Sequence, residues 1–291
     1  MYKYFECPDG QMVEIESCLK NCKMANRCLS IATLRLISEQ REWTGTPSTT
    51  QLLQGTREAY LKIVHDDLVM KPKAQLFRIL GTKSHLSLEK FTENELSEVR
   101  LEDENSTGAF DLYDPATKTL YDYKTWGSYK VACALGIKMI DVETGEVYKS
   151  GARKGQNKTR KEISYGTPDM KDVELQLNDY RMKLEASGFP VEQIIVEAIV
   201  RDGGTYVASG RGITENGYLI PVAILPDEEV KAYFTAKAEA LKHALETNTM
   251  PPECTDEECW DGRKCTGYCD VACKCDKGIR LNAPSEGMEV E

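Results

Sequence analysis

Residues 107–125, TGAFDLYDPATKTLYDYKT, decide the fold that we expect for this chain. The run 107–113 alternates apolar and polar side chains, which predicts a strand, and the composition of 114–117 predicts a turn. A second strand is predicted at 119–125. Two such strands would pair side by side in a sheet, joined by a short connection.

Three charged side chains lie on these strands. Asp111 belongs to the first strand, and Asp122 and Lys124 share one face of the second because strand side chains alternate. Carboxylates are ligands for Mg²⁺ or Mn²⁺, and a nearby lysine can orient or deprotonate a metal-bound water that attacks a phosphodiester. A surface hairpin with a cross-strand ion pair has the same local pattern, so further residues are needed.

Two predicted helices supply further polar residues. The helix at 73–91 contains His85, and the helix at 168–186 places Gln176 and Tyr180 four residues apart on one face. Taken alone, His85 is typical of a packed or solvent-exposed histidine. Gln176 and Tyr180 alone are typical of a polar helix stripe.

Four segments occur in a fixed order: GTKSHLSLE at 81–89, GAFD at 108–111, DYKT at 122–125 and QLNDY at 176–180. Together they resemble the RecB-type branch of the PD-(D/E)XK nuclease family, which includes the AddB nuclease domain and the CRISPR-associated RecB-like nucleases. The resemblance spans about 47–275. It implies an α/β, restriction-endonuclease-like fold with a mixed central sheet flanked by helices, and cysteine-rich metal-binding modules at both ends.

The resemblance also implies a role for each residue. The metal ligands would be His85, Asp111, Asp122 and the carbonyl of Tyr123. Lys124 would activate the water, while Gln176 and Tyr180 would position the substrate strand. The family more often has Glu at the position of Asp122, but the shorter side chain still supplies a carboxylate.

The cysteines form two groups with the same spacing. The pattern C-x10-C-x3-C-x5-C fits Cys7, Cys18, Cys22 and Cys28, and it recurs at Cys254, Cys265, Cys269 and Cys275. An identical spacing at opposite ends of one chain indicates two four-thiolate metal sites, and such sites can supply much of the folding energy of short segments.

Two interpretations of these metals stay open. In the first, each group binds a structural Zn²⁺. In the second, Cys265, Cys269 and Cys275 hold a [4Fe-4S] cluster, as the resemblance implies, with a fourth ligand from Cys254 or the N-terminal group. The family's usual N-terminal ligand is missing, because Gly55 stands at that place.

A disulfide framework fits these cysteines poorly. The first residues contain no apolar signal segment, and no run approaches the length of a membrane span. We therefore expect a cytoplasmic protein. With 291 residues, one catalytic core at 47–250 between an N-terminal module at 1–46 and a C-terminal module at 251–291 is the simplest organisation.

The net charge of -10 argues against broad electrostatic binding of DNA. Residues 149–161 are the exception, because they contain six cationic side chains and no acid. We expect 143–145 to form a hairpin turn, 146–149 to form a strand and 149–161 to form a loop. That loop is either solvated or closes over the strand being cut. No glycine-rich nucleotide loop is present, so helicase or ATPase activity is not expected.

These observations predict a Mg²⁺- or Mn²⁺-dependent DNA nuclease. The resemblance implies an exonuclease that acts on single strands or DNA ends, with a helicase, recombinase or other DNA-processing protein as partner. Phage recombination, DNA repair and defence are compatible contexts. The alternative is a non-catalytic nucleic-acid-binding module with structural zinc or iron–sulfur sites.

Overall fold

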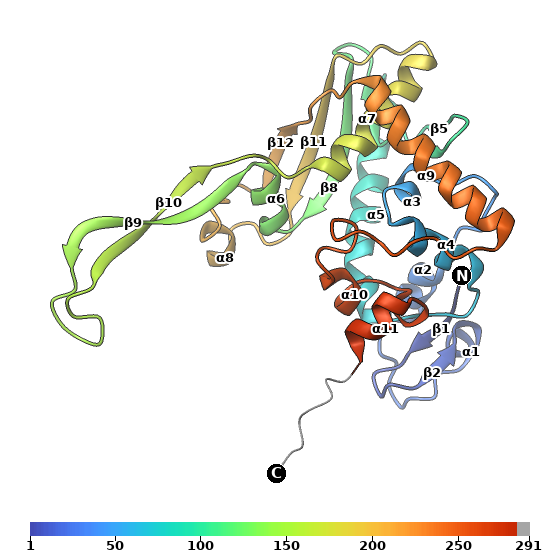
Figure 1. Cartoon of the computed structure of the whole chain (residues 1–291), viewed down its shortest axis with the longest axis horizontal. Helices are drawn as coiled ribbons and strands as arrows, with labels where there is room; N and C mark the ends of the chain where they lie inside the picture. The colour runs from blue at the N-terminus through green and yellow to red at the C-terminus, as the bar shows by residue number, and fades with distance from the viewer. Residues whose placement is uncertain (284–291) are drawn as a thin grey trace. The chain divides into compact units, whose positions relative to one another are not determined.

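The computed structural model describes residues 1–283, apart from the side chains of His85 and Leu86 (Figure 1). The chain divides into two compact units. Unit 1 comprises Met1–Lys83, Arg100–Ala109 and the described part of Pro226–Glu291, and unit 2 comprises Ser84–Val99 and Phe110–Leu225. This division by packing does not test the predicted boundaries at 46/47 and 250/251, which stay a prediction.

A five-stranded mixed sheet in the order β12-β11-β8-β7-β4 lies at the centre of unit 2. Its strands are β4 (Leu96–Ser97), β7 (Leu112–Asp114), β8 (Thr119–Trp126), β11 (Gln193–Val200) and β12 (Gly217–Pro221). β8 and β11 run parallel, and the other neighbours are antiparallel. The predicted mixed sheet with flanking helices is therefore confirmed at this coarse level.

Helices connect the parallel pair β8 and β11, because parallel strands require a long crossover. The helices of unit 2 are the end of α5 (Leu76–Leu88), η2 (Glu89–Phe91), α6 (Ser128–Ala134), α7 (Lys171–Ala186) and α8 (Tyr206–Ser209). α7 packs against β8. Leu120 of β8 and Leu177 of α7 are both fully buried, so the sheet and this helix share an apolar core.

The strand predicted at 107–113 is wrong, because the chain changes sheets in its middle. β6 (Thr107–Ala109) pairs with β5 (Arg100–Glu102), whereas β7 begins at Leu112 in the central sheet. Phe110, which is buried, and Asp111 lie between β6 and β7 and belong to neither strand. The apolar alternation continues across the break, so its period could not indicate where one sheet ends and the next begins.

The hairpin predicted at 143–145 and the loop predicted at 149–161 are also wrong. β9 (Ile137–Val147) runs through this turn signal and pairs with β10 (Asn157–Tyr165). Glu143 pairs with Thr159 but Val147 pairs with Asn157, so β9 bulges where Gly145 has a φ of 75°. The glycine signal marks this bulge, and the chain reverses only at 148–156. In Figure 1 the ribbon extends away from the central sheet of its unit.

Unit 1 contains small sheets and many short helices. Three strands form a sheet in the order β2-β1-β3: β1 (Tyr2–Glu6), β2 (Met12–Glu14) and β3 (Leu68–Met70). The helices are α1 (Ile15–Lys20), α2 (Ile31–Ser38), α3 (Thr49–Leu52), α4 (Thr56–Val64), η1 (Pro72–Gln75), α9 (Asp227–Thr247), α10 (Arg263–Gly267), η3 (Ala272–Lys274), α11 (Asp276–Asn282) and the start of α5. Phe5, Leu34 and Ile37 form a buried cluster with Cys18.

No helix within residues 1–283 has the length and apolar composition needed to cross a bilayer.

Candidate functional site

Asp111 lies at the edge of the central sheet, immediately before β7. Its Oδ2 accepts a hydrogen bond from the backbone N–H of Tyr123 at 2.7 Å, so the carboxylate takes the place of a strand residue opposite β8. The N–H and C=O groups of one strand residue point to the same side. The carbonyl of Tyr123 therefore also points toward the edge where Asp111 lies.

Asp122 and Lys124 form a largely buried ion pair on the face of β8 that carries Leu120. The Asp122 side chain is 3% exposed, and Lys124 Nζ lies 2.7 Å from Oδ2. The ammonium donates its hydrogen bond to Oδ1 at 2.9 Å, and Oδ2 accepts no hydrogen bond from any residue that the structure describes. One oxygen of a buried carboxylate is thus left with an ion-pair contact alone.

The charge of Lys124 is held by its acidic neighbours. Burial lowers the pKa of Lys124, but Asp122 and then Asp111 more than offset this effect, so that the pKa lies above its ordinary value. Both carboxylates are therefore close enough to act on the same ammonium. This places Asp111, Asp122 and Lys124 together near the start of β7, just beyond its pairing with β8.

α7 presents Gln176 and Tyr180 to this group. Gln176 Nε2 donates to the Tyr180 hydroxyl at 3.2 Å. Burial raises the pKa of Tyr180 to about 12, the Gln176 hydrogen bond lowers it, and the charges of Asp122 and Lys124 act on it in opposite directions. Since α7 packs against β8, the pair predicted to position a substrate strand lies beside the acidic residues.

The side chain of one predicted ligand is not described by the structure. His85 belongs to α5, but its side chain lies outside the described residues. Among the described side chains, no group of three or more His, Cys, Asp and Glu is arranged to hold a metal ion. Mg²⁺ is commonly held by only one or two protein carboxylates, together with waters and substrate phosphates. Asp111 and Asp122 are two carboxylates of this kind.

The four N-terminal cysteines lie near one another. Burial is the largest cause of the raised pKa of Cys18, followed by the nearby thiols of Cys22, Cys7 and Cys28. The pKa of Cys7 is also raised, by burial first and then by Asp9, Cys28 and Cys22. The four cysteines that share the repeated spacing therefore lie near one another in the folded chain.

The C-terminal cysteines are brought together in a different combination. Burial raises the pKa of Cys265, and the nearby thiols of Cys259 and Cys275 raise it further. Cys259 is 2% exposed, and the repeated spacing did not select it. The pKa of Cys269 is raised to about 11 by burial and then by Glu58, so this thiol lies among charged side chains. Cys259 lies outside the repeated spacing, and only its burial in the folded chain marks it as a member of this group.

Cys254 fills the space beside Gly55. A Cβ placed on Gly55 would overlap Cys254 Sγ and would lie 3.2 Å from Cys254 Cβ. The Cys254 thiol therefore lies where a side chain at position 55 would otherwise be placed. Burial raises the pKa of Cys254, and the nearby Cys275 contributes to this increase.

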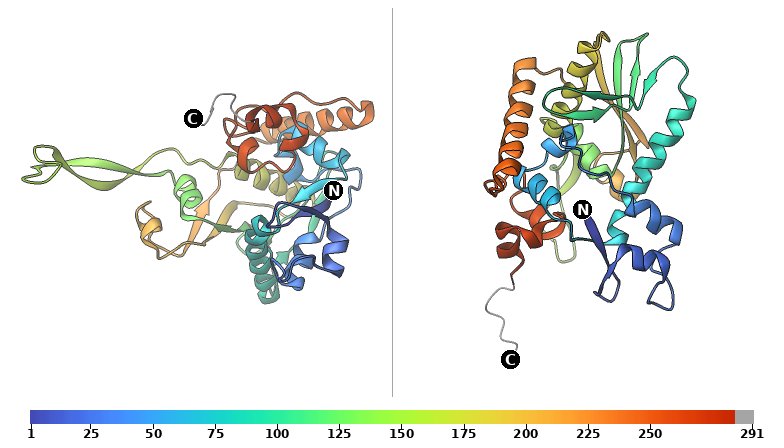
Figure 2. Two further views of the ribbon diagram at one scale, coloured as in Figure 1. Left: turned by 90° about the horizontal axis from the view of Figure 1, so that it is seen from below. Right: turned by 90° about the vertical axis from the view of Figure 1, so that its right-hand side faces the viewer.

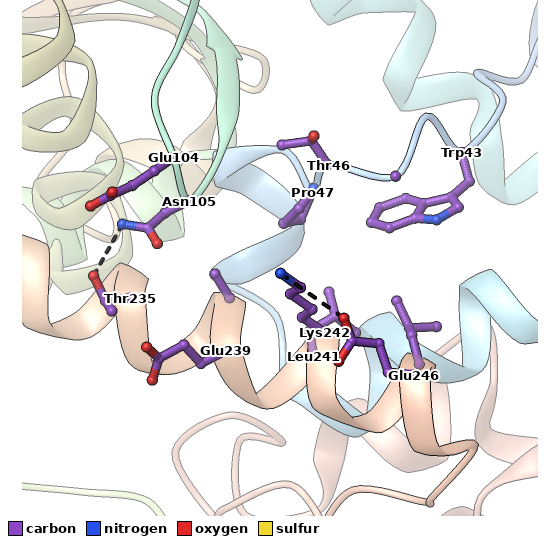
Figure 3. Close-up of a pocket in the computed structure, with 13 residues that line it drawn as sticks. Trp43, Thr46, Pro47, Glu104, Asn105, Thr235, Glu239, Leu241, Lys242 and Glu246 are labelled. Carbon is purple, nitrogen blue, oxygen red and sulfur yellow. Dashed lines mark hydrogen bonds and ion pairs between the residues drawn. The ribbon is translucent and has the colours of Figure 1, made fainter.

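A pocket of about 590 Å³ lies in unit 1 (Figure 3). Its lining includes Trp43, Glu104, Glu239, Lys242 and Glu246, and it includes none of the residues predicted to be catalytic or metal-binding. Three carboxylates in the lining make the pocket unsuitable for a phosphate group, because like charges repel.

No family model and no curated protein matches the sequence. Among solved structures, the crystal structure of SSO0001 is 16% identical to this chain, and the alignment covers 84% of this chain and 93% of that one. The TM-score is 0.43, which is too low to support an argument about fold or function.

Proposed function

We propose that this chain is a divalent-metal-dependent DNA nuclease with a restriction-endonuclease-like core, of the RecB-like type, that acts on single strands or DNA ends. The observation that carries the proposal is the grouping of Asp111, Asp122 and Lys124 near the start of β7, with Tyr180 beside them. Burial of an ion pair costs desolvation energy, so the Asp122–Lys124 pair is better explained by function than by stability.

The donor set suits Mg²⁺ or Mn²⁺. Asp111 and Asp122 supply hard carboxylate oxygens, and the buried Oδ2 of Asp122 lacks a hydrogen-bond donor among the described residues. The carbonyl of Tyr123 points to the same edge. A bound ion would polarise the scissile phosphodiester and lower the pKa of a water molecule.

The remaining residues act on the water and the substrate. Lys124 would orient the attacking water and offset the negative charge that develops on the phosphate, since its ammonium already lies beside the Asp122 carboxylate. Gln176 and Tyr180 would hold the DNA strand from α7, using the amide and the phenol that now bond to each other. In hydrolysis the water oxygen bonds to phosphorus, the bond between phosphorus and the leaving oxygen breaks, the water releases a proton to solvent, and the leaving oxygen takes up a proton from solvent.

The cysteines would hold structural metal. We propose Zn²⁺ on Cys7, Cys18, Cys22 and Cys28. For the C-terminal group, Cys254, Cys265 and Cys275 are donors for either Zn²⁺ or a [4Fe-4S] cluster, with Cys269 or Cys259 as the fourth thiol. Elemental analysis for zinc and iron, together with visible absorbance of the purified protein, distinguishes the two.

The test of catalysis is cleavage of an end-labelled DNA oligonucleotide in Mn²⁺. We expect Asp111→Asn and Lys124→Met each to lower the single-turnover rate by at least about a hundredfold. The matched controls are Asp114→Asn and Lys118→Met. Asp114 caps the turn after β7, and Lys118 pairs with Glu192 on the surface, so both variants should cleave at the parental rate.

Unchanged melting temperatures would show that the variants are folded. Equal rates for all four variants, or no cleavage by the parent, would overturn the proposal and favour a nucleic-acid-binding module without catalysis.

A further inference from the structure

The ribbon formed by β9 and β10 has the dimensions of a binding arm. Its strands pair from Ile137 and Tyr165 at the base to Val147 and Asn157 near the tip. At about 3.3 Å per residue this is a length of roughly 30 Å. The left view of Figure 2 shows the ribbon leaving the rest of its unit.

The base of the ribbon is fixed by close backbone contacts. Gly166 N–H donates to the Gly136 carbonyl at 2.7 Å, and a Cβ on Gly136, whose φ is 66°, would collide with the Gly166 carbonyl oxygen. Gly212 packs closely against Ile137 and Ile163. The ribbon therefore leaves the unit in a direction that these contacts set.

Beyond this base the ribbon is exposed. The side chains of Ile140 and Val147 are each 45% exposed. An isolated two-stranded ribbon is only marginally stable in water, so a ribbon of this length is more readily explained by a ligand than by folding.

The strands of the ribbon carry ion-paired cations, whereas its tip carries cations without nearby acids in the sequence. Along the strands, Lys158 pairs with Glu146 at 2.8 Å, Arg160 with Glu162 at 2.5 Å and Lys161 with Asp141 at 3.8 Å. The tip has three further cations, Lys149, Arg153 and Lys154, and no acid occurs between 147 and 161.

These three cations are exposed, and none of them has a carboxylate partner among the described residues. Arg153 instead lies over the Tyr148 ring, with its guanidinium carbon 5.8 Å from the ring centre. In a chain of net charge -10, the tip is a local cationic surface that suits a polyanion.

We propose that the β9–β10 ribbon is an arm that contacts duplex DNA, with Lys149, Arg153 and Lys154 on the phosphates. A two-stranded β-ribbon fits a major groove about 12 Å wide. A single-strand site would need aromatic side chains on which bases stack, and at the tip Tyr148 is already covered by Arg153. Such contacts position a protein on DNA without reading its sequence.

The inference rests on the proposed function only in taking DNA as the ligand. Its test is fluorescence anisotropy of the full chain without added Mg²⁺ or Mn²⁺, using a labelled duplex of about thirty base pairs, roughly three turns, and the matching single strand. The tip variant carries Lys149→Ala, Arg153→Ala and Lys154→Ala. The control variant carries Lys158→Ala, Arg160→Ala and Lys161→Ala, which removes the same charge from ion-paired positions.

We expect the tip variant to bind the duplex about ten- to a hundredfold more weakly at low salt, and its dependence of log K on log salt to be shallower by about 2 to 3. The control variant should lose less than about threefold, since its cations are already neutralised. Equal losses in both variants, no loss in either, or a loss confined to the single strand would overturn the proposal. The last outcome would indicate a single-strand site.

Cleavage distinguishes this inference from the proposed function. The tip variant should still cut a short single-stranded oligonucleotide in Mn²⁺ at the parental rate, because the site at β8 is unchanged. If the parent binds duplex through the tip but cuts nothing, the nuclease proposal fails and the arm stands.

Discussion

The acidic site of unit 2 and the cysteine groups of unit 1 differ in what holds their side chains in place. Asp122 and Lys124 lie on a strand whose register with β11 is fixed over its whole length, and Tyr180 lies on a helix of 16 residues. The cysteines lie in short helices and irregular segments, and only Cys18, Cys259 and Cys265 are buried.

The two proposed kinds of metal site would therefore be held in place by different interactions. A sheet and a packed helix position carboxylates through their own hydrogen bonds, so a weakly held ion can come and go with the substrate. Short irregular segments bury too little apolar surface to order themselves, and a tightly bound metal would then supply part of their folding energy.

Removal of metal should give the largest effect, and it should loosen the cysteine segments while leaving the central sheet unchanged. After chelation, we expect faster amide hydrogen exchange at 7–28 and 254–275, because structural zinc in small modules is worth roughly 10 to 16 kcal/mol. The amides of β8 and β11 should exchange as before. Exchange that increases equally in both regions, or in neither, would contradict the comparison.

The same contrast explains what the sequence could predict. Regular periodicity located β8 and α7, and with them Asp122, Gln176 and Tyr180, because the hydrophobic pattern follows directly from which face is buried. It could not show the break at Phe110 or the bulge at Gly145, since both interrupt pairing without interrupting the pattern. Cys259 was missed because tertiary packing, not spacing, brings it beside Cys265.

The second largest effect should come from the buried ion pair on α7. Lys183 Nζ lies 2.5 Å from Asp179 Oδ2, with both side chains less than 5% exposed. Lys183→Met would remove the buried ammonium that contacts Asp179, and breaking a buried ion pair should lower the free energy of unfolding by about 3 to 5 kcal/mol. Urea unfolding followed by circular dichroism measures this.

Lys118→Met is the matched control for that measurement. Lys118 pairs with Glu192 at the surface of the same unit, where the two side chains are 44% and 63% exposed. Its loss should cost less than about 1 kcal/mol. Similar losses for the two variants would show that α7 is not held by its buried pair, and that the acidic site is no more rigid than the surface.

A smaller effect is expected where Gly55 meets Cys254. Gly55→Ala adds a methyl group that overlaps Cys254 Sγ, and should destabilise unit 1 by about 1 to 3 kcal/mol through overpacking. In a Cys254→Ala background the same change should cost much less, which a double-mutant cycle would detect. Gly267→Ala is the control, because a Cβ there meets no atom within 4 Å. Additive losses would show that the thiol does not occupy this space.

The smallest effect concerns the start of α6, which follows β8. Asp202 accepts hydrogen bonds at 2.6 Å from both the N–H and the hydroxyl of Ser128. Asp202→Ala should lower the free energy of unfolding by about 1 kcal/mol, as the loss of a helix cap does. Asp172→Ala, in the first turn of α7, should change it by no more than about 0.5 kcal/mol.

The pH dependence of the stability lost in Asp202→Ala tests whether the ionised carboxylate of Asp202 is responsible for it. The Ser128 hydroxyl, and then the Ser128 N–H, hold the pKa of Asp202 below its ordinary value of 3.8. A carboxyl group whose pKa is lower in the folded state stabilises the fold fully above the unfolded pKa, and this contribution is lost as the pH falls through the folded pKa. The gap between the parent and Asp202→Ala should therefore narrow from about pH 6 to about pH 3. A gap that stays constant would mean that Asp202 acts through packing, and that α6 needs no ionised cap to stay at the end of β8.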